Sequence, residues 1–84
     1  MKEIAYSRTA LKALTRMPRN TARRIRDKIR DFADDPSSQA DNVTRLKGHD
    51  GLVRLRVGDW RVVMRDESVL QVLTVAGRGS AYRE

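Results

Sequence analysis

Apolar residues in the first half of the chain recur at spacings that predict one short strand and a helix. Residues 3–6 lean apolar and predict a strand. Ser7 follows, and serine is a favoured helix N-cap, so we expect a helix that begins at Arg8. Its apolar positions repeat at helical spacing. They are Ala10, Leu11, Leu14 and Met17.

A second helix is predicted to start at Pro18, because proline is well accommodated in a first helical turn. It ends where Asp34, Asp35 and Pro36 follow one another. Its apolar stripe consists of Ala22, Ile25, Ile29, Phe32 and Ala33. Basic residues cover much of the remaining surface, namely Arg19, Arg23, Arg24, Arg26, Lys28 and Arg30. Since Asp27 and Asp31 offer pairs within the helix, we interpret these basic residues mainly as a solvated outer face. Residues 34–42 are expected to form a loop.

The second half of the chain predicts strands. Residues 43–46 form a short run, and residues 69–75 a longer one. Between them, residues 52–57 and 60–65 flank Gly58 and Asp59, a pair typical of a type II′ hairpin turn. The expected order is β-α-α-β-β-β. We therefore predict an α+β fold, with a small, largely antiparallel sheet and a pair of helices packed on one face.

Strand alternation makes a sharper prediction for the hairpin. Val53, Leu55 and Val57 share one face of the first strand, while Arg54 and Arg56 share the other. A two-residue turn pairs Arg56 with Arg61 on the same face as Arg54. A like-charge pair across two strands is destabilising by itself. Such a pair persists where the face is well solvated, where acidic residues neutralise it, or where an anion binds, and neither strand carries an acidic residue on this face. Because arginine suits bidentate phosphate binding, we interpret this arginine face as a site for a nucleic-acid backbone.

Composition limits the class of protein. The chain has 84 residues, a net charge of +7 and no cysteine. This length predicts one domain over residues 1–84 and excludes a two-domain enzyme with a deep cofactor cleft. The absence of cysteine excludes disulfides and thiolate zinc sites. With neither a signal peptide nor a membrane-spanning run in the sequence, we expect a cytoplasmic protein, no membrane partner and an anionic ligand.

The last segment adds two candidate residues. Residues 76–84 are rich in small side chains and leave the final strand. They can return toward the arginine face and bring Arg78 and Tyr82 to it, where a tyrosine can stack on a base. His49, the single histidine, lies between two glycines and is interpreted as a plain loop residue.

Three segments together resemble the RelE/ParE toxin superfamily, the toxin halves of bacterial type II toxin–antitoxin pairs. They are residues 45–48, residues 53–63, and Arg78 with Tyr82. The resemblance covers nearly the whole chain, and the predicted element order agrees with it. It implies a ribosome-dependent endonuclease that enters the A site of the 70S ribosome and cuts mRNA. Cleavage would use the 2′-OH of the substrate and neither a metal nor a cofactor.

The resemblance also implies roles for individual residues. Arg56, Arg61, Arg78 and Tyr82 match the catalytic positions of the family. Other basic residues are expected to contact RNA, namely Arg45, Lys47, Arg54, Arg65 and Arg83. Three features depart from the family pattern. Gly77 stands where several relatives have His or Lys, and the Glu–His pair of some relatives is missing. The sequence also stops at Glu84, so we expect no C-terminal helix after Tyr82.

The same resemblance leaves the target open. Toxins of the ParE branch inhibit DNA gyrase without nuclease activity, and a simple nucleic-acid-binding module is a third alternative. The complete arginine–arginine–tyrosine set favours the ribonuclease. In each toxin alternative we expect a cognate antitoxin, an acidic or amphipathic protein encoded by an adjacent gene.

Overall fold

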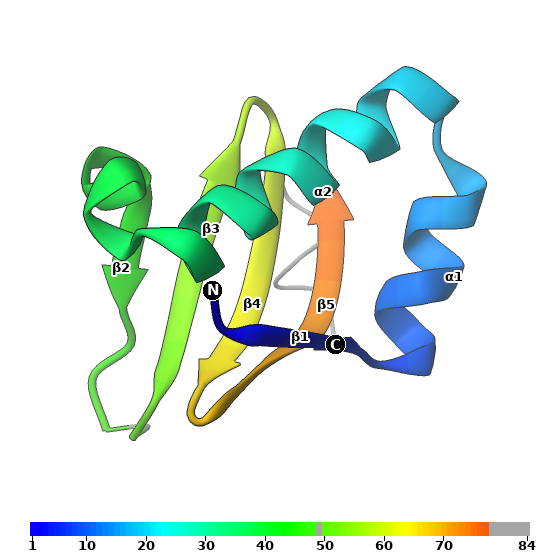
Figure 1. Ribbon diagram of the computed structural model, residues 1–84. Coiled ribbons are helices and arrows are strands. Elements are labelled where there is room, and N and C mark those ends of the chain that lie inside the picture. Colours follow the sequence, from blue (N-terminus) through cyan, green and yellow to red (C-terminus); the bar gives the residue numbers. More distant parts are fainter. Residues whose placement is uncertain (49, 78–84) are drawn as a thin grey trace.

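The computed structural model describes residues 1–48 and 50–77. Along the chain it contains a strand, two helices, a 3-10 helix and four further strands (Figure 1). The elements are β1 (Glu3–Tyr6), α1 (Arg8–Arg16), α2 (Arg19–Asp34), η1 (Pro36–Asn42), β2 (Val43–Arg45), β3 (Leu52–Val57), β4 (Trp60–Asp66) and β5 (Val69–Gly77). The prediction of an α+β fold is confirmed. The short apolar run predicted at residues 43–46 forms β2, which is one more strand of the sheet.

Ser7 starts α1 as the sequence predicts and also ties it to the sheet. The Ser7 Oγ accepts a hydrogen bond from the Ala10 backbone N–H at 3.0 Å. The same hydroxyl donates to the Leu73 carbonyl of β5 at 2.6 Å. The Ser7 backbone N–H donates to the Val72 carbonyl at 2.9 Å. One residue therefore caps the helix and anchors it to β5.

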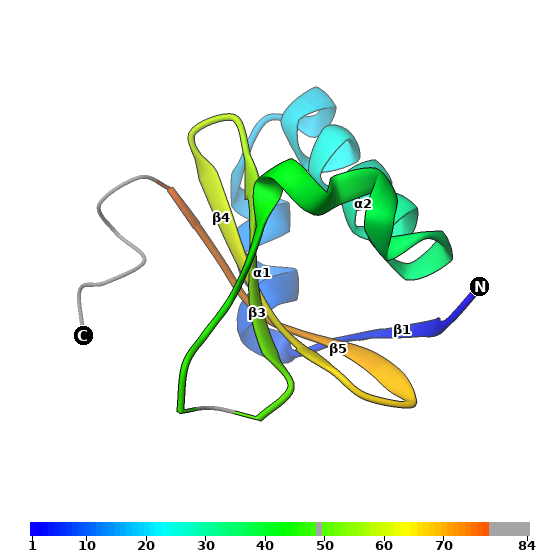
Figure 2. The same cartoon turned by 90° about the vertical axis from the view of Figure 1, so that its left-hand side faces the viewer.

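Both helices cover the same face of the sheet (Figure 2). The hydrophobic core lies between the helices and this face. In α2, Ile25, Ile29 and Phe32 are buried, as the apolar stripe predicts. Pro18 precedes α2 as its N-cap residue, and its carbonyl accepts from the Ala22 N–H at 3.0 Å. The amide N–H groups of a first helical turn have no partner within the helix. The lack of a backbone N–H at this proline therefore removes no helical hydrogen bond.

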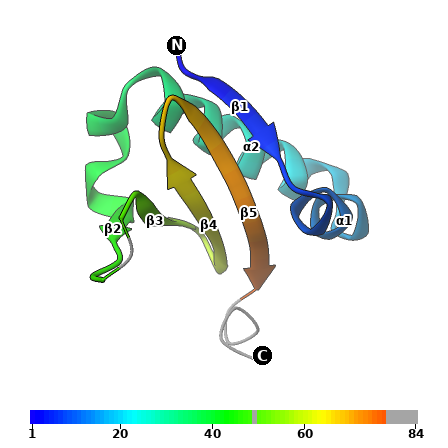
Figure 3. The same cartoon turned by 90° about the horizontal axis from the view of Figure 1, so that it is seen from below.

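The five strands lie in the order β1-β5-β4-β3-β2. The sheet is antiparallel except that β1 pairs with β5 in parallel, seen from below in Figure 3. A parallel pair requires a long connection, and here nearly the whole chain separates the two strands. The register of β3 and β4 pairs Val57 with Trp60 and Arg56 with Arg61, as the two-residue turn predicts.

A β-bulge in β5 keeps the core continuous. Val63 pairs with Thr74 whereas Met64 pairs with Val72, which leaves Leu73 as an additional residue. The additional residue shifts the alternation of β5, so that Leu70, Val72 and Val75 are all buried. The bulge also directs the Leu73 carbonyl to the Ser7 hydroxyl.

One local expectation was wrong. Residues 36–42 form the 3-10 helix η1 in place of the predicted loop. Asp35 starts it by accepting from the Ser37 N–H at 3.2 Å, and Pro36 supplies a preset φ. Leu11 does not join the core and is 42% exposed, because α1 contacts the sheet along the row formed by Ala10 and Leu14.

No helix in the described part of the chain has both the length and the apolar character needed to cross a membrane.

Replacing Ser7 with alanine removes the helix cap and the bond to the bulge together. We expect Ser7→Ala to lower the free energy of unfolding by about 1–2 kcal/mol, because a capping interaction and a half-buried hydrogen bond are lost. Urea denaturation measures this. Thr15→Ala is the matched control, because the Thr15 hydroxyl bonds only the exposed Lys12 carbonyl. Equal losses in the two variants would contradict the dual role of Ser7.

Candidate nucleic-acid interface

The hairpin of β3 and β4 places three arginines on the face of the sheet opposite the helices. Val53, Leu55, Val57, Val62 and Met64 are buried on the helix side. Arg54, Arg56 and Arg61 alternate with them and point the other way, Arg56 being exposed and the other two half-buried. We call these three residues the arginine face.

The turn that brings Arg56 opposite Arg61 depends on Gly58. Its φ is 59°, a left-handed conformation that favours glycine, and no described non-glycine residue has a positive φ. This pattern fits the type II′ turn predicted from the sequence. A Cβ at position 58 would also lie 2.8 Å from the Arg24 Nη2 of α2. The guanidinium of Arg24 therefore lies against the tip of the hairpin.

Two shallow hollows open on the arginine face. One, of about 260 Å³, is lined by Arg56, Gly58, Asp59 and Arg61. The other, of about 180 Å³, is lined by Arg54, Arg56 and Arg61 together with Asp41, Asn42 and Thr44. Arg56 and Arg61 border both hollows, so an anion in either would meet two guanidinium groups.

Sequence reasoning missed several residues at this site. Asp41 and Asn42 come from the segment that was expected to be a loop. Arg24, which lies against the hairpin tip and lines neither hollow, was assigned to a solvated helix face. The position of Thr44 could have been predicted from strand alternation. It alternates with the inward-facing Val43 and pairs across the strands with Arg54. The other three have no local signal, because their positions depend on how η1 and α2 pack against the sheet.

Three other predicted RNA contacts lie apart from Arg54, Arg56 and Arg61, although Arg65 alternates onto the same face of the sheet. Arg45 pairs with the inward-facing Val53 and is 3.8 Å from the Asp66 carboxylate. Asp66 also forms an ion pair with Lys2. The Arg65 Nη1 donates to the Asp50 carbonyl at 3.2 Å, at the opposite end of the hairpin from Gly58. Lys47 is exposed in the turn after β2. The structure does not bring these residues together with Arg56 and Arg61.

Arg78, Tyr82 and Arg83, together with His49, lie outside the described residues. Their assignment to the site stays a prediction from the sequence.

The charges of the site suit an anionic ligand. Arg56 and Arg61 face each other across the strands, where like charges repel. In the described ranges 1–48 and 50–77, no carboxylate lies within ion-pair distance of Arg56. The same ranges contain no cluster of histidine and acidic residues that could hold a metal ion. The guanidinium groups of Arg56 and Arg61 can stabilise negative charge at the site.

Several solved structures of toxins share this fold. The structure resembles the RelE–RelB complex from Pyrococcus horikoshii OT3, with 26% identity, a TM-score of 0.75, and coverage of 93% of this chain and 96% of that chain. The RelB–RelE complex from Methanococcus jannaschii matches at 20% identity and a TM-score of 0.75, over 94% and 95% of the two chains. The E. coli RelBE complex matches at 18% identity and a TM-score of 0.75, over 94% and 98%. A search of curated proteins finds no match.

The family-model match and the likeness of the fold together identify a small toxin of the RelE/ParE superfamily. The chain belongs to the family described as the ParE toxin of type II toxin–antitoxin systems, whose sequence pattern it matches over residues 4–82.

The pair of Arg56 and Arg61 is expected to favour anion binding while lowering the stability of the folded protein. We expect Arg56→Gln to raise the free energy of unfolding by about 0.3 kcal/mol at low salt, because cross-strand repulsion is relieved. The gain should disappear at high salt, where screening removes the repulsion. Urea denaturation at two salt concentrations measures it, with Arg16→Gln on the surface of α1 as control. A gain that does not depend on salt would contradict an electrostatic origin.

Proposed function

We propose that this toxin is a ribosome-dependent mRNA endonuclease of the RelE type, which acts without a metal or cofactor. The observation that carries the proposal is the pair of Arg56 and Arg61 across the strands, beside two hollows open to solvent. The RelE likeness of the fold supports the same proposal.

The chemistry follows from charge stabilisation. In-line attack by the 2′-OH of the RNA on the adjacent phosphorus forms a bond to phosphorus and breaks the bond to the 5′-oxygen. Negative charge develops on the phosphorane oxygens, where Arg56 and Arg61 would stabilise it. The 2′-OH loses its proton as it attacks and the leaving 5′-oxygen gains one, so the transesterification balances and gives a 2′,3′-cyclic phosphate and a 5′-OH.

Arg78 and Tyr82 complete the proposed site. Arg78 would stabilise the leaving 5′-oxygen, and Tyr82 would stack on a base and orient the 2′-OH. Arginine stays protonated and is a poor general base. Orientation and charge stabilisation therefore contribute more to the rate than proton transfer by these residues. Arg54 would bind the RNA backbone beside them. We propose the same for Arg45, Lys47, Arg65 and Arg83, at a greater distance from the reacting phosphate.

The proposed partners are mRNA, the A site of the ribosome and a cognate antitoxin. The fold neighbours described as RelE–RelB complexes support an antitoxin partner. We propose that the toxin acts in the cytoplasm, where ribosomes and mRNA are found.

A second candidate function is inhibition of DNA gyrase without nuclease activity. The observation that favours it is the match to the ParE family over residues 4–82. On this alternative the arginine face would bind the DNA backbone or the gyrase–DNA complex, and no RNA would be cut.

Cleavage of mRNA in a translation extract tests the proposal. We expect Arg61→Ala to lower the single-turnover cleavage rate on ribosomes by about 100-fold or more, because a group that stabilises the transition-state charge is lost. Arg16→Ala, which removes the same charge from the surface of α1, should keep the full rate.

The outcomes separate the candidates. Full cleavage by Arg61→Ala would refute the assignment of this residue. If the unmodified protein leaves mRNA intact and stabilises gyrase–DNA cleavage complexes, the ParE alternative is correct. If it does neither and still binds RNA, the protein is a nucleic-acid-binding module.

A further inference from the structure

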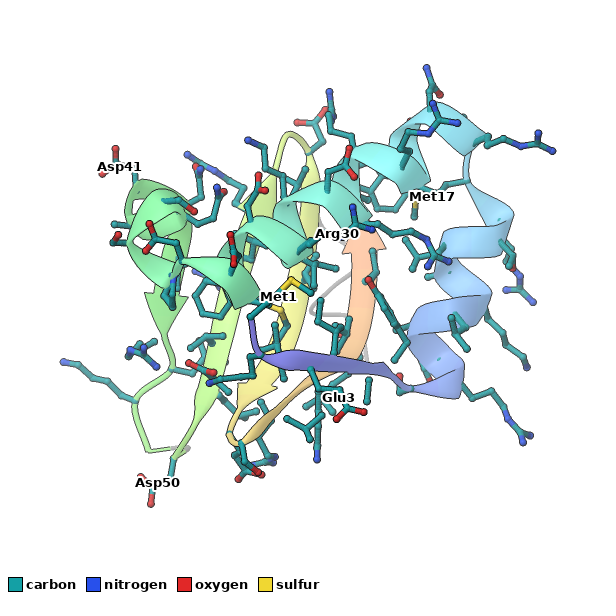
Figure 4. The ribbon with its side chains drawn as sticks, in the orientation of Figure 1. Met1, Glu3, Met17, Arg30, Asp41 and Asp50 are labelled. Atoms are coloured by element: carbon teal, nitrogen blue, oxygen red, sulfur yellow. The ribbon has the colours of Figure 1, made fainter. Side chains whose placement is uncertain are left out.

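The hollow of about 180 Å³ on the arginine face combines two kinds of chemistry. Part of its lining is the arginine face itself. The rest consists of three polar residues from the end of η1 and the start of β2, namely Asp41, Asn42 and Thr44. Figure 4 labels Asp41, where η1 leads into β2. Guanidinium groups beside hydrogen-bonding side chains suit a nucleotide better than a bare phosphate, because a base needs both a stacking surface and hydrogen bonds at its edge.

The 3-10 helix η1 holds Asp41 in a defined position. The Asp35 carboxylate accepts from the Ser37 backbone N–H at 3.2 Å at the start of η1. The Ser38 hydroxyl donates to the Asp35 carbonyl at 2.7 Å. Gln39, in the middle of the segment, is only 5% exposed. Because the segment is ordered before any ligand binds, recognition by Asp41 loses little conformational entropy.

The Asp41 carboxylate is not a counter-ion of the arginine face. None of the ion pairs among residues 1–48 and 50–77 includes Asp41, although it lines the same hollow as three arginines. Asp41 is exposed, and a carboxylate in this place repels the phosphates of any nucleic acid. It therefore weakens binding in general and favours a ligand whose own hydrogen bonds to the carboxylate offset the repulsion.

We infer that this hollow binds one base of the RNA and that Asp41 selects guanine. The inference rests on the proposed function, because it assigns a base to the strand whose phosphate lies at Arg56 and Arg61. Guanine presents two adjacent donors on its Watson–Crick edge, N1–H and the N2 amino group, and a carboxylate accepts from both. Adenine and cytosine each present an amino donor beside an acceptor nitrogen, and uracil presents one N–H between two carbonyls. Of the four bases, guanine alone pairs fully with a carboxylate.

Neighbouring groups complete the base site. Arg54 lies across the strands from Thr44, and its guanidinium offers a flat surface on which a base can stack. The Asn42 amide and the Thr44 hydroxyl each carry a donor, which suits the O6 and N7 acceptors of guanine. Arg56 and Arg61 border both hollows, so a phosphate held between them leaves an adjoining nucleotide free to place its base beside Asp41.

Binding of short RNA oligonucleotides tests the inference on the full chain. The probes are single-stranded uridine oligonucleotides of equal length that carry one central guanosine, adenosine or cytidine, or none. We expect the unmodified protein to bind the guanosine probe about tenfold more tightly than the adenosine probe, as one bidentate contact predicts. In Asp41→Asn we expect this ratio to fall within about twofold, because an amide carries a donor and an acceptor and pairs with adenine as well.

Asp59→Asn is the matched control. It makes the same isosteric change and removes the same charge, at the other hollow on the arginine face. Loss of this charge should strengthen the binding of all probes by a similar factor and leave the guanosine-to-adenosine ratio unchanged. The ratio therefore separates base recognition from a general electrostatic effect.

The outcomes distinguish this inference from the proposed function. Equal binding of the guanosine and adenosine probes by the unmodified protein would overturn the inference. An unchanged ratio in Asp41→Asn, or an equal fall in Asp59→Asn, would do so as well. Mapping of the cut sites in a translation extract is an independent measurement, in which Asp41→Asn should lose the excess of cuts beside guanosine. A guanosine preference that requires Asp41, found in a protein that leaves mRNA intact on ribosomes, would count against the proposed function alone.

Discussion

A turn of only two residues between β3 and β4 leaves one register for the hairpin. Gly58 takes a φ of 59°, and Arg24 lies where a side chain at this position would be. With the turn set, Val57 pairs with Trp60 and Arg56 with Arg61. A shift of one residue would turn the apolar side chains of one strand toward solvent and its arginines toward the core. The register of this hairpin therefore fixes two features at once. It buries Val53, Leu55, Val62 and Met64, and it gathers Arg54, Arg56 and Arg61 on the opposite face.

The two faces of the sheet serve different purposes. The helix side holds the core, where α1 and α2 cover the strands (Figure 2). The opposite side holds the like charges of Arg56 and Arg61, which face each other across the strands. The outer surface of the helix layer holds a second basic region, in a groove between α1 and α2. The net charge of +7 is thus divided among regions with different neighbours.

Much of the fold was predictable because its signals are local. The strand at residues 3–6, the cap at Ser7, the apolar stripe of α2 and the hairpin register all come from short-range periodicity or turn chemistry. The bulge at Leu73 was not predictable, because residues 69–75 contain apolar side chains at both parities and either set could face the core. Packing selects Leu70 and Val72, and the freed Leu73 carbonyl binds Ser7 of a segment distant in sequence.

The candidate site divides in the same way. The sequence by itself determined that Arg54, Arg56 and Arg61 share a face, because strand alternation has a period of two and a two-residue turn allows no slip. Only the tertiary structure decided that Arg24 lies against Gly58, that Asp41 borders a hollow, and that Arg45 is held by Asp66. It likewise placed four arginines of α2 beside α1. The physical reason is that these positions depend on where separate elements pack against the sheet, and no short-range periodicity records that packing.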